Sequence, residues 1–172
     1  MRRTLLVGLA LVVGAVLAVF ISSWFDLELE PVVLLGVALG AVIALVPDRS
    51  PLMRLAGFAG GFVAAWIGYF LRAAVLPDST GGRAVAVGLV LILVVAVAAV
   101  SLERIPLWST LVGAAALAGA YEYTYAAAPP EVASTSVSTA TALLLTAAIG
   151  YLATALAVPA EGRPAGGARR TR

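Results

Sequence analysis

The sequence contains no cysteine, no histidine and no lysine, and it has few charged residues of either sign. Without cysteine there is no disulfide bond and no thiol nucleophile. Without histidine there is no imidazole base, and most zinc and haem sites lose their usual ligands. Only 12% of the 172 residues are charged, whereas a soluble domain has about 25%. These absences argue against most catalytic chemistry and against an ordinary soluble domain.

Apolar residues take the place of the missing ones: they make up 62% of the chain, and the mean hydropathy is +1.07. A helix rises about 1.5 Å per residue, so about 20 apolar residues cross the hydrocarbon core of a bilayer. We therefore expect an all-α polytopic integral membrane protein, with six transmembrane helices forming one domain over residues 1–158. The predicted spans are about 4–25, 31–46, 52–76, 84–100, 106–128 and 137–158. Residues 159–172, rich in Arg, Gly and Pro, are typical of a disordered tail.

The arginines predict the orientation of these spans. If both termini are cytoplasmic, the cytoplasmic side receives Arg2, Arg3, Arg49, Arg54, Arg104, Arg163, Arg169, Arg170 and Arg172. The outer loops then hold one arginine, Arg83, and the acidic residues Asp26, Glu28, Glu30, Asp78 and Glu131. Because cytoplasmic loops carry an excess of basic residues, we expect a multi-pass plasma-membrane protein with cytoplasmic termini and a cytoplasmic tail.

Two opposite charges lie inside the apolar runs. At about 1.5 Å per residue, Arg72 is roughly 6 Å and Glu122 roughly 9 Å from the outer end of its run. A charge within a membrane is costly, and pairing the two would offset much of that cost. We expect a direct or water-bridged Arg72–Glu122 contact. The alternative is that Arg72 extends to the headgroups and Glu122 lies beside a wet loop.

Small residues share a helix face with each of these charges, and small residues mark helix–helix interfaces in membranes. Steps of three and four residues back from Arg72 and Glu122 predict two buried faces. They are Gly68, Ala65, Ala64, Gly61 and Gly57 on one helix, and Ala118, Ala115 and Leu111 on the other. The aromatic ridge of Phe58, Phe62, Trp66 and Phe70 then falls on a different side, facing lipid or a looser contact.

Tyrosines gather at the same depth as the two charges. The candidate ligand-binding residues are Arg72, Glu122, Tyr69, Tyr121 and Tyr125, an outward-facing group suited to a small polar or zwitterionic solute. The alternative is an aromatic belt, which is common at membrane interfaces, combined with a structural Arg72–Glu122 ion pair. We predict no metal site, no cofactor and no catalytic residue.

The inner turns resemble one another: Asp48-Arg49-Ser50-Pro51 and Glu103-Arg104-Ile105-Pro106 both read acid-Arg-x-Pro. Two explanations fit equally. One is a tandem repeat of helical hairpins, predicted helices 2–3 and 4–5, related by an axis along the membrane normal. The other is repeated use of a good turn sequence.

Two functions fit these observations. The first is a transporter component or solute-binding membrane subunit; in size and topology the chain is similar to the substrate-binding subunits of energy-coupling-factor transporters. The second is a non-catalytic structural or accessory subunit of a larger membrane complex. The expected partners are the lipid bilayer and either another membrane protein or a second copy of the chain, and not nucleic acid. The chain has no Gly-x-Ser-x-Gly elbow and no phosphate loop, so we do not expect an enzyme.

Overall fold

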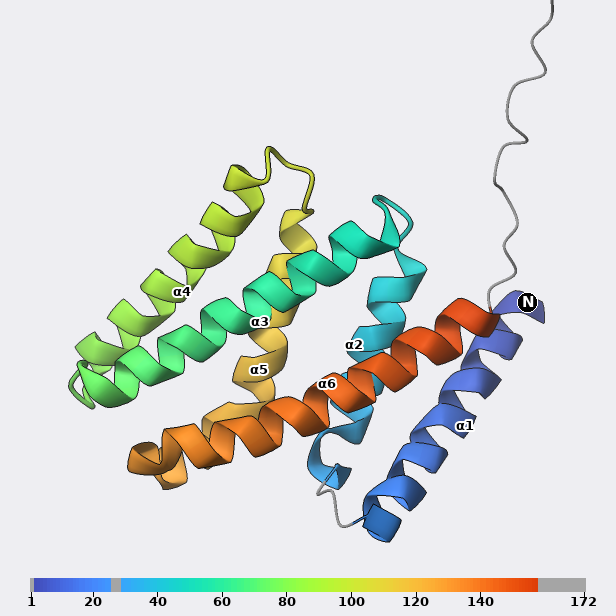
Figure 1. Cartoon of the computed structure of the whole chain (residues 1–172), viewed down its shortest axis with the longest axis horizontal. Helices are drawn as coiled ribbons and strands as arrows, with labels where there is room; N and C mark the ends of the chain where they lie inside the picture. The colour runs from blue at the N-terminus through green and yellow to red at the C-terminus, as the bar shows by residue number, and fades with distance from the viewer. Residues whose placement is uncertain (1, 26–28, 158–172) are drawn as a thin grey trace, which may run out of the picture.

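A computed structural model describes residues 2–25 and 29–157, and these ranges are helical with short turns between the helices (Figure 1). The predicted all-α class is therefore confirmed. The tail predicted over 159–172, and the acidic residues Asp26 and Glu28, lie outside the described residues. The helices are α1 Arg2–Phe25, α2 Val33–Leu45, α3 Pro51–Ala74, α4 Thr80–Val100, α5 Leu107–Ala127 and α6 Val132–Ala157. Two short 3-10 helices, η1 Glu30–Val32 and η2 Pro129–Glu131, precede α2 and α6.

Four segments are long and apolar enough to cross a membrane: Thr4–Phe25, Pro51–Ala74, Thr80–Val100 and Pro129–Ala157. The other two helices differ from this group for separate reasons. The 13 residues of α2 span only about 20 Å, against about 30 Å for the hydrocarbon core. The 21 residues of α5 are long enough, but its last third is rich in Tyr, Glu and Thr. Six complete spans therefore remain a prediction.

The ends of the helices follow from local side-chain chemistry. Ser50 caps α3 by accepting a hydrogen bond from the backbone N–H of Met53, and Pro51 occupies the first turn, where no donor is lost. Helix α6 begins at Val132, earlier than the predicted residue 137. The hydroxyls of Ser134 and Thr135 both donate to the carbonyl of Glu131. These polar residues thus form the first turn of the helix, ahead of the predicted span.

Helix α2 packs mainly on α6, and glycines allow the two backbones to touch. A Cβ atom added at Gly36 would overlap the hydroxyl of Thr146. One added at Gly40 would overlap the carbonyl oxygen of Ala147, and one at Gly150 would overlap that of Val37. The contacts therefore involve positions i, i+1 and i+4 of both helices. These are Gly36, Val37 and Gly40 on α2, and Thr146, Ala147 and Gly150 on α6.

Helix α3 packs mainly on α5, and the contacts have the same spacing as those between α2 and α6. A Cβ added at Gly57 would overlap the hydroxyl of Ser109, and one at Gly61 would overlap the carbonyl oxygen of Thr110. One added at Gly113 would overlap the carbonyl oxygen of Phe58. Positions i, i+1 and i+4 of both helices again form the crossing, so the bundle contains two closely similar helix crossings.

This pairing does not confirm the tandem-hairpin repeat. The hairpin partners α2 and α3 contact one another little, whereas each makes its main contact with a helix distant in the sequence. In both crossings, residues later in one helix contact residues later in the other. Helix α2 therefore runs parallel to α6, and α3 runs parallel to α5. The two pairs run in opposite directions: in Figure 1, α3 proceeds toward the α4 turn while α6 proceeds back toward the N-terminus of the chain.

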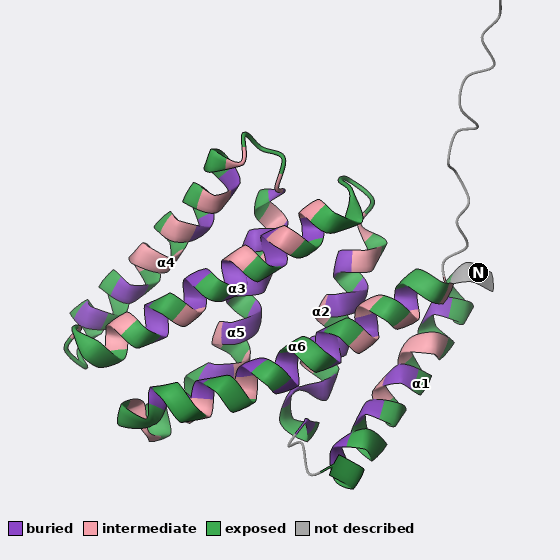
Figure 2. Cartoon of the chain, in the orientation of Figure 1, coloured by how far each residue is buried: buried purple, intermediate pink, exposed green. Residues whose placement is uncertain are grey.

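The two crossings form the core, and α1 and α4 lie outside it (Figure 2). The predicted small-residue face of α3 is buried as expected. The predicted face of α5 is wrong: Leu111 and Ala115 are exposed, and the buried face instead runs through Thr110, Leu117 and Tyr121. The hydroxyl-bearing and glycine positions of α5, such as Ser109, allow closer approach to α3 than its alanine row does.

The aromatic ridge of α3 is also more buried than predicted. Phe58 and Phe62 are 5% and 2% exposed, and their rings lie 6.1 Å apart between centroids. Trp66 is half-buried, and its indole N–H donates to the hydroxyl of Ser136 on α6 at 2.9 Å. Only Phe70, at 41% exposed, has the lipid-facing position expected of the ridge.

Arg54 has a role that the topology argument did not assign. It is 6% exposed and reaches across the turn to the C-terminal end of α2. One guanidinium nitrogen donates to the carbonyls of Ile43 at 2.5 Å and Ala44 at 3.2 Å, and also to that of Val46. These carbonyls lack helical partners, and a cation is favourable at a helix C-terminus. Arg54 therefore fixes α2 against the start of α3.

Candidate functional site

Arg72 and Glu122 lie in contact where α3 and α5 end. The Nη1 atom of Arg72 is 2.9 Å from Oε1 and 3.2 Å from Oε2 of Glu122. The Arg72 side chain is only 10% exposed, whereas the Glu122 side chain is 55% exposed. The carboxylate thus keeps an open side, while the guanidinium is enclosed by protein.

Two tyrosines hold this pair in place. The Tyr69 hydroxyl, one helical turn before Arg72, donates to Oε2 of Glu122 at 2.7 Å. The guanidinium carbon of Arg72 lies 4.5 Å from the centroid of the Tyr125 ring, within the range of a cation–π contact. The rings of Tyr69 and Tyr125 are themselves 5.1 Å apart. The Arg72–Glu122 pair therefore packs against the side chains of Tyr69 and Tyr125, which limit its freedom to reorient.

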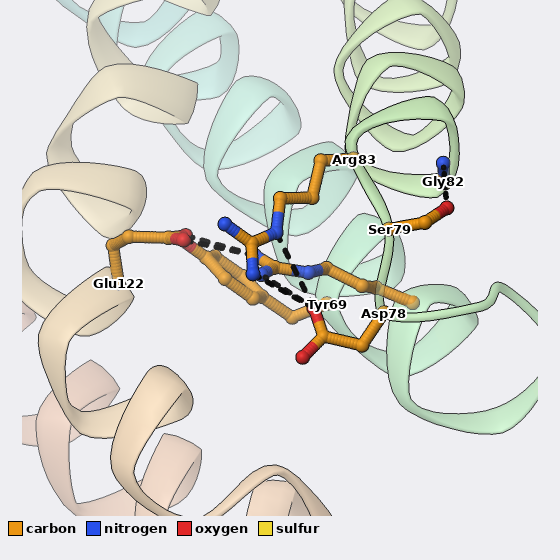
Figure 3. Close-up of polar contacts among 7 residues, drawn as sticks. Tyr69, Asp78, Ser79, Gly82, Arg83 and Glu122 are labelled. Atoms are coloured by element: carbon orange, nitrogen blue, oxygen red, sulfur yellow. Dashed lines mark hydrogen bonds and ion pairs between the residues drawn. The ribbon is translucent and has the colours of Figure 1, made fainter.

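The network extends to the turn between α3 and α4 (Figure 3). Asp78 Oδ1 lies 2.9 Å from Nη2 of Arg83 and 3.9 Å from Nη2 of Arg72. Ser79 positions this segment, because its hydroxyl accepts a hydrogen bond from the Gly82 N–H at 3.1 Å and so caps α4. In Figure 3, Arg83 extends from α4 and Glu122 from α5, and both line the same cavity. Two guanidiniums and two carboxylates form one neutral cluster.

An apolar cavity of about 480 Å³ leads away from these charges between α3, α4 and α5. Its charged end is formed by Arg72, Arg83 and Glu122, with the Tyr69 side chain beside them. The remaining wall is small and aliphatic: Ala65, Gly68, Ala86, Val87, Val90, Leu91, Leu111, Ala114, Ala115 and Ala118. A pocket of this kind offers one polar and one apolar region to a ligand.

The five predicted ligand residues fall into two groups. Tyr69, Arg72 and Glu122 line the cavity. Tyr121 and Tyr125 do not, since they are 0% and 2% exposed and pack behind Tyr69. The Tyr121 hydroxyl turns toward α6, 2.7 Å from the hydroxyl of Thr135. These two tyrosines therefore support the site from behind and cannot touch a ligand in the cavity.

Sequence reasoning missed the contribution of the α3–α4 turn. Arg83 was placed in an outer loop, but it lies in the first turn of α4 and lines the cavity. The available signal was the Asp78-Ser79 pair, because a helix capped at Ser79 brings Arg83 back toward Asp78. Among the residues described, no group of three or more acidic side chains is placed to hold a metal ion. The cluster can instead pair with a ligand that carries both charge signs.

Comparison with protein-family models, curated proteins and solved structures found no match to this chain.

Proposed function

We propose that this chain is a non-catalytic integral membrane protein that binds a small zwitterion with an apolar side, as a transporter component or solute-binding subunit. One observation carries the proposal: charges of both signs stand at one end of a cavity whose other walls are aliphatic. A bound zwitterion would place its anionic group between the cavity-facing edge of Arg72 and the more exposed Arg83, and its cationic group at the open side of Glu122. Its apolar part would contact the alanine and valine walls.

The proposed topology has six spans with both termini cytoplasmic. In that orientation the Arg72–Glu122 cluster faces outward, and α3 and α5 run toward the outer side while α2 and α6 run inward. The absence of cysteine in the sequence allows a direct test. Thr80→Cys should react with an impermeant maleimide on intact cells, and Arg49→Cys should react only after permeabilisation. Labelling of both from the same side would contradict this topology.

Binding is tested best with a matched series of ligands. L-leucine carries both charges and an apolar side chain; glycine lacks the side chain, isovalerate lacks the ammonium and isopentylamine lacks the carboxylate. We expect only leucine to bind measurably by calorimetry to the purified chain in detergent. Equal heats from leucine and from either singly charged analogue would contradict the proposal.

A variant whose cavity is filled by a larger side chain can distinguish leucine binding in the cavity from nonspecific adsorption of leucine to the protein. Ala115→Phe places a large ring in the cavity from an exposed position, so it should abolish leucine binding without disturbing the core. Ile92→Phe is the matched control, because Ile92 is 66% exposed on α4 and does not line the cavity. Undiminished binding by Ala115→Phe would show that leucine binds elsewhere.

The second candidate is a structural or accessory subunit, and a specific observation favours it. Each oxygen of Glu122 already has a partner, in Arg72 and Tyr69, so the pair is satisfied without a ligand. The exposed apolar faces of α1 and α4 would then contact a partner protein or lipid. Under this candidate, Glu122→Ala disrupts folding or assembly and leaves no ligand effect to measure.

A further inference from the structure

A second cavity lies at the same end of α5, and none of the reasoning above uses it. It has a volume of about 650 Å³ and is bounded by the end of α1, the η1 turn, α5 and the start of α6. Six hydroxyl side chains line it, those of Ser22, Ser23, Thr124, Thr135, Ser138 and Thr139, together with the carboxylate of Glu30. Side-chain hydroxyls thus dominate a hollow in an otherwise apolar bundle.

Most of these hydroxyls are not engaged by the protein. Serine and threonine within a helix commonly bond to a carbonyl of their own preceding turn. On α6, Thr141 does so with Val137 at 2.8 Å, but the nearby Ser138 and Thr139 have no hydrogen bond to any described residue. The same holds for Ser23 and Thr124 within the described part of the chain. Four hydroxyls of the lining are therefore without a partner among the described residues and can bond to a ligand.

Among the described residues that line this cavity, Glu30 is the one charged side chain, and none of them is basic. Its position is fixed by the residue before it, since the backbone N–H of Leu29 donates to the buried hydroxyl of Ser22 at 2.9 Å. Leu29 is itself 1% exposed, so the η1 turn is anchored in the core. The exposed carboxylate of Glu30 therefore lies in the same lining as these hydroxyls.

The two cavities are separate. On α5 the first is lined by Ala118 and Glu122, and the second by Ala120 and Thr124. At 3.6 residues per turn, a step of two residues is about 200° around the helix. The cavities therefore occupy opposite faces of α5, and occupancy of one does not require the other.

We infer that this second cavity binds a small hydroxylated organic amine. A protonated amine offers N–H donors to Glu30 and to the hydroxyl oxygens, while the hydroxyls of the ligand satisfy the free serines and threonines. A neutral polyol would leave the carboxylate without a counter-charge, and an anion would meet no cation at all. A bare metal ion would leave most of a 650 Å³ hollow unfilled.

Three sugars of one shape test the inference, with the full-length chain purified in detergent. Glucosamine is cationic, glucose neutral and glucuronate anionic, and all three carry similar hydroxyls. At a pH where the amine is protonated, calorimetry should show glucosamine binding about tenfold or more tightly than glucose, with no heat from glucuronate. Equal binding of glucose, or no binding of glucosamine at millimolar concentration, would overturn the inference.

Matched variants locate the binding. Glu30→Gln should reduce glucosamine affinity to that of glucose, and Thr139→Val should weaken binding of both sugars several-fold. Thr141→Val is the control, because that exposed hydroxyl already bonds to Val137 and lies outside the cavity. Helix content by circular dichroism should be unchanged in all three variants. Retention of the glucosamine preference by Glu30→Gln, or an equal loss in Thr141→Val, would contradict the assignment.

Discussion

The α2–α6 and α3–α5 crossings are built alike, but only the second ends in a cluster of charges. Both use positions i, i+1 and i+4, with glycines against backbone carbonyls. Among the described residues, no ion pair joins α2 to α6, whereas Arg72 joins α3 to Glu122 of α5. Small-residue packing is therefore sufficient to hold a crossing of this kind. Because packing does not require the charges of the α3–α5 crossing, we propose that they serve ligand binding.

The largest effect is expected where a side chain is added to a crossing. Gly61→Leu would drive a side chain into the Thr110 carbonyl, and Gly150→Leu would do the same at Val37. Because the crossings are equivalent, each change should lower the free energy of unfolding by about 3 kcal/mol. Unfolding by SDS titration, followed by circular dichroism, measures both.

Gly88→Leu provides the control for this pair, since a Cβ at Gly88 meets nothing within 4 Å. It should leave the free energy of unfolding nearly unchanged. A loss at Gly88 as large as that at Gly61 would mean that leucine is harmful at any glycine, and the proposed equivalence of the crossings would lose its support.

A somewhat smaller loss is expected at Arg54, which holds the end of α2. Arg54→Gln removes the guanidinium that bonds to Ile43 and Ala44, so stability should fall by about 2 kcal/mol. Arg49→Gln, at an exposed position in the same turn, should have little effect. The same titration compares the two, and equal losses would show that only the charge of the turn matters.

Reversal of the Arg72–Glu122 pair should have a moderate effect, because the Glu122 side chain is half-exposed and solvent screens the contact. Arg72→Glu and Glu122→Arg should each cost about 1 kcal/mol of stability. The double reversal should recover more than half of the summed loss. A double variant no more stable than the worse single variant would contradict a direct pairing.

The smallest effect is expected at the hydrogen bond behind the site. Tyr121→Phe removes the contact with Thr135 and should cost about 0.5 kcal/mol, with leucine affinity unchanged. Tyr123→Phe is the control, since Tyr123 is 89% exposed. A large loss of leucine binding in Tyr121→Phe would mean that this buried ring does more than support Tyr69.

Periodicity and depth located the charged site well. Arg72 and Glu122 were matched by their distance from the ends of their helices, and the structure brings them within 2.9 Å. The glycine face of α3 was also predicted correctly, because small residues every three or four positions have one main use in such a helix. Local patterns of this kind can be read from a single helix.

The surroundings of a side chain that contacts a neighbouring helix could not be predicted from the pattern of its own helix. Tyr121 and Tyr125 were assigned to the ligand because they lie at the same depth as the two charges, but both are buried, and the Tyr121 hydroxyl turns toward α6. Arg54 was counted only as a cytoplasmic charge, since nothing local reveals that the end of α2 lies within its reach. The pairing of α2 with α6 joins distant parts of the chain, and the turn sequences suggested adjacent hairpins instead.

The most direct test of the account measures stability and leucine binding together in a variant that carries both Arg72→Gln and Glu122→Gln. We predict that leucine affinity falls about 100-fold, as the loss of two charge contacts implies, while stability changes by no more than about 1 kcal/mol. A stability loss as large as that of Gly61→Leu, with leucine binding unaltered, would show that the charges hold the crossing together and do not serve a ligand.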